Sequence, residues 1–133
     1  MEKKLRTWCE ISLDALEHNI RAYRNKVGSD VKILGVVKAD AYGHGAQEVA
    51  EVLEKNGADF LAVACIDEAI QLRDAGLTLP ILILGYTDRG YAKEFIKYDI
   101  LPTGPRRASV VALIGLVALL QAVSGCYPDR KAC

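Results

Sequence analysis

The chain has 133 residues, a formal net charge of zero and a sequence pI near 6.7. This balance of charges gives no reason to expect a nucleic-acid partner or an anionic membrane surface. With 51% hydrophobic and 26% charged residues, the composition is that of a soluble globular domain rather than a disordered chain.

The N-terminal stretch MEKKLRTWCEIS carries positive charges with no apolar core behind them. It therefore does not predict a signal peptide, and we expect a cytoplasmic location. The four cysteines form no CxxC pair, and the two histidines lie at spacings unsuited to zinc (Cys9, Cys65, Cys126, Cys133, His18, His44). We predict no metal site.

From residue 7 to residue 103, short apolar strands alternate with amphipathic helices. TWCEIS (7–12) predicts a strand. LDALEHNIRAYRNKV (13–27) predicts a helix, because its apolar residues recur at helical spacing. After a turn at 28–30, VKILGVV (31–37) is nearly all apolar, as is typical of a parallel strand buried on both faces.

The same alternation continues along the chain. The pattern predicts a helix at 46–55, a strand at FLAVA (60–64), a helix in DEAIQLRDAG (67–76), a strand at ILILG (81–85), a helix near 91–98 and a short strand at 100–101. Such repeats indicate right-handed βαβ units and a parallel sheet. A (β/α)₈ barrel and an open doubly wound sheet both fit. A barrel needs about 250 residues, so this chain could supply about half of one.

The composition changes at Gly104. Residues 1–103 contain 13 Lys and Arg against 16 Asp and Glu, a net charge of −3, whereas residues 104–133 carry +3. The apolar run from Val110 to Val123 is shorter than the roughly 20 residues of a membrane span. We favour a terminal hydrophobic helix, with a weak membrane anchor as the alternative.

The strand at 31–37 ends on a single lysine, Lys38, followed by ADAYGHG. Active sites of α/β folds lie at the carboxyl ends of parallel strands, and a lysine amine there can form a Schiff base with an aldehyde. A lysine extending into solvent would give the same pattern, so both interpretations stay open. Tyr42 could offer its hydroxyl to a phosphate, or it could be a packed aromatic at a loop corner.

Taken together, these segments resemble the N-terminal part of alanine racemase. The likeness begins at TWCEISLDALEHNI, is strongest at VVKADAYGHG, and continues through GADFLAVACIDEAIQLRDAG and LPILILG to about YDILPT. The AYGHG continuation points to alanine racemases and to related serine and broad-specificity amino-acid racemases. The resemblance implies an α/β fold, with residues 1–103 forming part of a (β/α)₈ TIM-type barrel and residues 104–133 an unrelated hydrophobic tail.

The resemblance also implies a chemistry, that of an isomerase which interconverts L- and D-alanine for peptidoglycan synthesis with pyridoxal 5'-phosphate as cofactor. Lys38 would hold the cofactor through a Schiff base and act as one of two bases, on the face of the D-amino acid. Tyr42 would hydrogen-bond the cofactor phosphate, and Leu84 would line its pocket. The substrate would be a small amino acid, and the family is homodimeric.

Some of the family's pattern has no counterpart in this sequence. The second base is a tyrosine of a C-terminal β-domain contributed by the partner subunit, and an arginine faces the pyridine nitrogen. We therefore keep two functions open: a truncated racemase of low or no activity, and a non-catalytic fragment or cofactor-binding pseudo-enzyme. A change of reading frame near Gly104 would explain the tail, and translating the other two frames there would test it.

Overall fold

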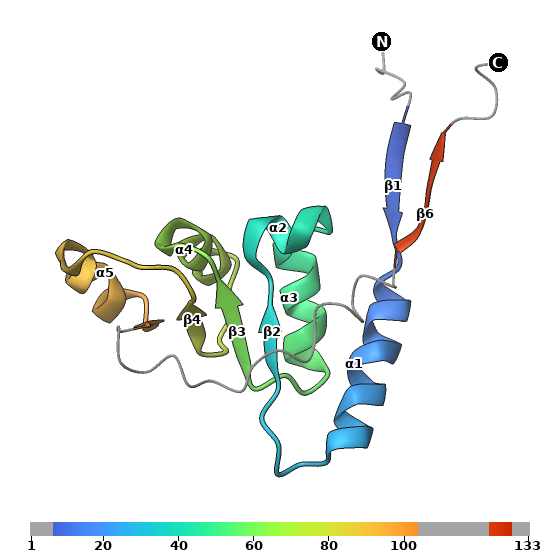
Figure 1. Ribbon diagram of the computed structural model, residues 1–133, viewed down its shortest axis with the longest axis horizontal. Helices are drawn as coiled ribbons and strands as arrows, with labels where there is room; N and C mark the ends of the chain where they lie inside the picture. Colours follow the sequence, from blue (N-terminus) through green and yellow to red (C-terminus); the bar gives the residue numbers. More distant parts are fainter. Residues whose placement is uncertain (1–6, 104–122, 129–133) are drawn as a thin grey trace.

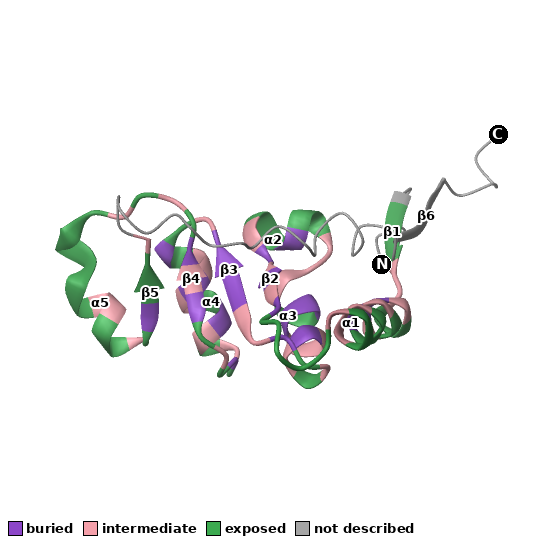
Figure 2. Cartoon of the chain, turned by 60° about the horizontal axis from the view of Figure 1, so that its bottom comes forward, coloured by how far each residue is buried: buried purple, intermediate pink, exposed green. Residues whose placement is uncertain are grey.

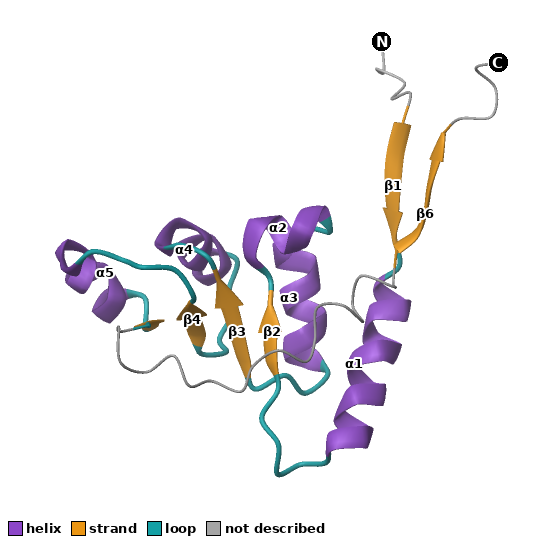
Figure 3. Cartoon of the chain, viewed as in Figure 1, coloured by secondary structure: helices purple, strands orange, loops and turns teal. Residues whose placement is uncertain are grey.

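The computed structural model describes residues 7–103 and 123–128 of the chain. Its elements, in order, are β1 (Thr7–Ile11), α1 (Leu13–Val27), β2 (Leu34–Val36), α2 (Lys38–Gly43), α3 (Ala46–Lys55), β3 (Phe60–Val63), α4 (Ile66–Asp74), β4 (Ile81–Ile83), the 3-10 turn η1 (Arg89–Tyr91), α5 (Ala92–Lys97), β5 (Ile100–Pro102) and β6 (Val123–Pro128). Every strand and helix predicted up to residue 103 is present (Figure 3). The elements that we did not predict are α2, η1 and β6.

A four-stranded parallel sheet forms the centre of the fold. Its strand order is β2-β3-β4-β5, so each strand pairs with the next one along the chain. A helical segment joins each pair of neighbouring strands (Figure 1). The predicted parallel sheet is therefore confirmed, and the carboxyl ends of all four strands lie at one edge of it.

One face of the sheet is covered by helices and carries the core. Leu61 and Val63 of β3 are fully buried, as is Ile81 of β4, and they join Leu53 of α3 in a single buried cluster (Figure 2). Gly35 of β2 allows this close packing, because a Cβ there would lie 2.5 Å from Cδ1 of Leu53. The position of β2 is thus fixed by tight contact with α3.

The other face of the sheet is less covered. The strand register places Val36, Ala62, Leu82 and Leu101 in one row across the four strands. Leu101 is 42% exposed and Val36 and Leu82 are half-buried, whereas Ala62 is fully buried. We predicted burial of β2 on both faces from its apolar sequence, and the structure buries one face fully and the other in part. Helices pack on one side of the described sheet, so burial alternates along the strand.

β1 does not belong to the parallel sheet. It pairs antiparallel with β6, with Thr7 opposite Pro128 and Ile11 opposite Val123, and the pair stands apart from the parallel sheet in Figure 1. The hydrophobic helix predicted at Val110–Val123 lies outside the described residues, apart from Val123 at the start of β6. Among the residues that the structure describes, no helix is long and apolar enough to cross a membrane.

Charged side chains form hydrogen bonds and ion pairs with the loops at the amino end of the sheet. Arg24 of α1 donates to the Gly57 carbonyl and pairs with Asp59, whose carboxylate also accepts the Ile33 amide at 2.8 Å. Burial alone would raise the pKa of Asp59. The Ile33 amide and the neighbouring cations, Lys32 and Arg24, outweigh burial and lower this pKa from 3.8 to about 2.

The low pKa of Asp59 predicts a loss of stability in acid. A carboxyl with a lower pKa in the folded state stabilises the fold above its unfolded pKa, and this contribution disappears as the pH falls through the folded value. The window here runs from 3.8 down to about 2. Denaturant titrations across it should show a loss of about 1–2 kcal/mol from Asp59, allowing for solvent screening of a partly exposed group.

The control for this prediction is Asp59→Asn. Its side chain does not ionise and cannot satisfy Arg24 as an anion, so the variant should be less stable at neutral pH and should lose less stability on acidification. An unchanged acid dependence in Asp59→Asn would contradict the assignment.

Candidate functional site

Lys38 is the first residue after the hydrogen bonds of β2 end. The preceding amide, of Val37, still donates to the Ala62 carbonyl at 2.8 Å, and the Val37 side chain is buried in the core. Lys38 itself is half-buried. The sheet therefore fixes the backbone just before Lys38 and sets this lysine at the carboxyl edge of the strands, where α/β folds place their active sites.

The chain turns into a left-handed helical conformation directly after Lys38. The four residues from Ala39 to Tyr42 have φ between 50° and 57° and ψ between 35° and 50°. This conformation costs an L-residue about 1–2 kcal/mol, and non-glycine residues normally adopt it singly. A backbone of this kind persists only where its surroundings impose it, and such strain is concentrated at functional sites.

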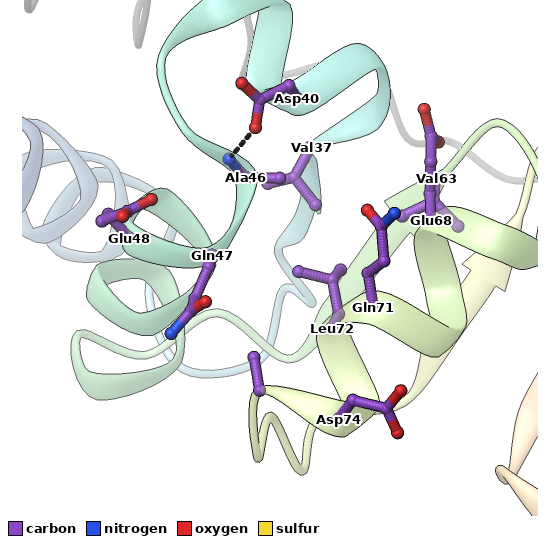
Figure 4. Close-up of a pocket in the computed structure, with 11 residues that line it drawn as sticks. Val37, Asp40, Ala46, Gln47, Glu48, Val63, Glu68, Gln71, Leu72 and Asp74 are labelled. Atoms are coloured by element: carbon purple, nitrogen blue, oxygen red, sulfur yellow. Dashed lines mark hydrogen bonds between the residues drawn. The ribbon is translucent and has the colours of Figure 1, made fainter.

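Contacts on several sides hold this left-handed turn (Ala39–Tyr42). The Ala41 amide donates to the Val37 carbonyl at 3.0 Å, and Ala41 is buried in the core. The Asp40 carboxylate accepts the Ala46 amide at 2.8 Å and so caps α3 (Figure 4). The Ala39 amide donates to the Glu68 carboxylate at 2.8 Å. The chain leaves the turn through Gly43 and Gly45, whose φ values of 86° and 90° favour glycine.

The left-handed turn brings the two predicted site residues together. Lys38 and Tyr42 are four residues apart, one helical turn, and Nζ of Lys38 lies 5.8 Å from the centre of the Tyr42 ring. That distance is near the outer limit of a cation–π contact. Tyr42 is 43% exposed. A primary amine and a phenol ring thus lie close together just after the end of β2.

Leu84, the third residue predicted at the site, follows β4 at the same edge of the sheet. Its amide donates to the Val63 carbonyl at 2.8 Å, and its side chain is 43% exposed. No contact joins its side chain to Lys38 among the described interactions. The structure therefore places Leu84 at the same edge as the lysine, with β3 between them.

A cavity of about 560 Å³ lies between the α2–α3 segment and α4, on the helix side of the sheet (Figure 4). Neither Lys38 nor Tyr42 lines it. Its described lining includes the carboxylates of Asp40, Glu48, Glu68 and Asp74 and no lysine or arginine. Because Lys38 and Tyr42 do not line it, we do not assign this cavity as the cofactor site.

These observations define an α/β domain with a lysine at the carboxyl end of a parallel strand. The family model of the alanine racemase N-terminal domain matches residues 11–117. The chain belongs to this family, whose members are isomerases. The match reaches past Thr103, where we expected the likeness to end, and the division of the chain at that residue stays a prediction.

Individual relatives agree with the family match. The chain is 54% identical over 97 residues to alanine racemase 2 of Oceanobacillus iheyensis and 52% identical over 96 residues to alanine racemase of Clostridium perfringens. It covers 25% of each, so the chain spans about a quarter of the length of the curated relatives it matches. The corresponding stretches make up 73% and 72% of this chain.

Solved structures show the same relation. Alanine racemase of Clostridium difficile 630 superposes with a TM-score of 0.72 at 50% identity, over 77% of this chain and 28% of that one. The Bacillus anthracis alanine racemase with bound L-Ala-P gives a TM-score of 0.73 at 39% identity, over 78% and 27%. The predicted fold class, an α/β fold forming part of a (β/α)₈ barrel, is thereby confirmed.

The sequence patterns did not reveal the left-handed conformation or the contact between Ala39 and Glu68. Of Ala, Asp, Ala and Tyr, only Asp has any left-handed preference, and the glycines of GHG lie after the turn. Glu68 is the third residue of α4, where an acidic side chain typically caps its own helix. This position was visible in the sequence, but its bond to a residue 29 positions earlier was not.

The left-handed turn predicts that a glycine substitution within it stabilises the protein, which is unusual for a helical segment. Ala39→Gly should stabilise the protein by about 1 kcal/mol, because glycine adopts φ near 51° without the steric cost that alanine bears. Ala22→Gly is the matched control, since Ala22 is also exposed but lies inside the right-handed helix α1. There the substitution should destabilise by about 1 kcal/mol.

Urea denaturation of both variants beside the unmodified chain measures the difference. Equal destabilisation by the two glycines would contradict the left-handed conformation of Ala39.

Proposed function

We propose that this chain forms the lysine-bearing part of a pyridoxal-phosphate-dependent racemase that interconverts L- and D-alanine. The observation that carries the proposal is the left-handed turn, which sets the Lys38 amine beside Tyr42 at the carboxyl edge of the sheet. Membership of the alanine racemase family supports the same assignment. So does the L-Ala-P bound by the Bacillus anthracis relative, which points to an amino-acid substrate.

The residues present suit pyridoxal phosphate. A lysine amine condenses with an aldehyde and releases water, and a tyrosine hydroxyl donates a hydrogen bond to a phosphate oxygen. Lys38 and Tyr42 would hold these two ends of the cofactor. When bound, the cofactor supplies a conjugated ring that spreads the negative charge left by removal of the α-proton.

Lys38 would also move the proton. With cofactor and substrate bound, the amine of Lys38 would accept the α-proton at Nζ and return it. The turn keeps this amine on one face of the substrate. Inversion at the α-carbon requires a second base on the opposite face, so the complete reaction is proposed for a protein that contains both bases. A cofactor-binding protein without turnover is the alternative function.

The first test is cofactor binding. Purified protein mixed with pyridoxal phosphate should develop the absorbance band of a lysine-bound cofactor, and reduction with borohydride should fix the cofactor to the peptide that contains Lys38. Lys38→Ala should lose both signals. Lys55→Ala is the matched control, because Lys55 is a strongly exposed lysine at the end of α3, and this variant should keep them.

Tyr42→Phe should weaken cofactor affinity about tenfold while the lysine adduct remains, since it removes one hydrogen bond to a charged phosphate. A band that persists in Lys38→Ala would refute the proposed site.

D-alanine formation tests whether this chain by itself supplies both bases. We expect the 133-residue chain to bind cofactor but to produce little or no D-alanine, because one base serves one face of the substrate. A chiral assay of L-alanine incubated with the loaded protein measures this outcome. Rapid, Lys38-dependent racemisation would show that the chain carries a second base.

A further inference from the structure

The carboxylate of Glu68 joins two strand ends at the candidate site. One oxygen, Oε1, accepts the amide of Ala39 at 2.8 Å, and the other, Oε2, accepts the amide of Ala64 at 2.7 Å. Ala39 begins the left-handed turn after β2, and Ala64 directly follows β3. A half-buried side chain of α4 therefore ties the backbone beside Lys38 to the neighbouring strand.

Capping of α4 alone does not account for this geometry. A glutamate at the third position of a helix typically reaches back to the amide of its own N-cap residue. The N-cap here is Cys65, yet Glu68 bonds the residue before it and, with its second oxygen, an amide from another βα unit. The second bond spans 29 residues of sequence and contributes nothing to the helix that carries Glu68.

The bond to Ala39 acts on the conformation of Lys38. The peptide group that donates it links Lys38 to Ala39, so fixing its N–H sets the direction in which the chain leaves the lysine. The first amides of a helical turn have no partner within the turn, and a carboxylate acceptor makes a stronger bond than a neutral one. Glu68 therefore supplies an acceptor at the point where the backbone enters its strained, left-handed conformation.

The far side of the turn is held in the same manner. Asp40 accepts the Ala46 amide through its side chain and the Gly45 amide through its backbone carbonyl, which ties the turn to the start of α3. The turn is thus fixed to α4 at its first residue and to α3 at its second. Loss of the Glu68 bond would free the end that carries Lys38 while the Asp40 bonds remain.

We propose that Glu68 is a positioning residue of the Lys38 site, holding the left-handed turn so that the Lys38 amine and Tyr42 face the same bound aldehyde phosphate. The inference rests on the proposed function, because the value of this geometry lies in binding pyridoxal phosphate. In the protein without cofactor, Glu68 should also protect the Ala39 amide from hydrogen exchange.

The test compares Glu68→Ala with Glu54→Ala in the full chain. Glu54 is the matched control because it is also a half-buried glutamate that accepts backbone amides, those of Thr78 and Leu79. These amides precede β4 and so lie at the opposite end of the strands from Lys38. Glu68→Gln serves as a milder variant, since it keeps the shape and one acceptor oxygen but faces the second amide with an NH₂ group.

Two measurements are made on each variant, restricted to samples that remain folded by circular dichroism. Hydrogen exchange of the Ala39 amide without cofactor should be about tenfold faster or more in Glu68→Ala, faster by a smaller factor in Glu68→Gln, and unchanged in Glu54→Ala. The dissociation constant for pyridoxal phosphate, from the Lys38-dependent absorbance band, should rise about tenfold or more in the Glu68 variants. Glu54→Ala should lose stability without a comparable change in affinity.

The outcomes separate the inference from the proposed function. Normal Ala39 exchange in Glu68→Ala, or equal loss of affinity in Glu54→Ala, would overturn the positioning role of Glu68. If the unmodified chain forms no Lys38-dependent band, the proposed function fails, and the positioning role toward the cofactor fails with it. Hydrogen exchange then still decides whether Glu68 anchors the turn.

Discussion

Burial of one face of the parallel sheet fixes where β2 ends, and the candidate site depends on that end. Close contact between Gly35 and Leu53 locks β2 against α3, and the Val37 amide continues the sheet pairing up to the residue before Lys38. A flexible strand end could relax the left-handed turn into a cheaper backbone conformation. Because the core holds the strand and Ala41 is itself buried, that relaxation would expose apolar surface.

Carboxylates that accept hydrogen bonds from backbone amides stabilise the loops at both ends of the sheet. At the amino end, Asp59 and Glu54 accept amides that precede β2 and β4, and these contacts hold loops in place. At the carboxyl end, Glu68 and Asp40 make the same kind of bond to a strained segment that carries a reactive amine. The same kind of hydrogen bond, from a backbone amide to a carboxylate, therefore stabilises loops at the amino edge and positions site residues at the carboxyl edge. This agrees with the general rule that α/β folds keep stability at one end of the strands and the active site at the other.

The sequence was sufficient to predict the order of the elements, the parallel sheet and the lysine at its edge, because apolar periodicity and glycine stops are local signals. Helix α1 begins at the predicted residue, Leu13, and the hydroxyl of Ser12 before it accepts the Ala15 amide. The conformation of Ala39–Tyr42 could not be predicted in this way. It is imposed by contacts with Glu68, Ala46 and the core, and three of its four residues, Ala, Ala and Tyr, carry no left-handed preference. The pairing of β1 with a segment more than a hundred residues away was equally invisible.

The bond between Ala39 and Glu68 also has a consequence for how the chain acquires its structure. Protein chains emerge from the ribosome amino end first, so the strand that carries Lys38 is made before the helix that supplies Glu68. Until that later helix docks, the segment after Lys38 has no acceptor for its first amide and no reason to stay left-handed. The turn after Lys38 therefore reaches its final conformation late, although the strand before it is synthesised early.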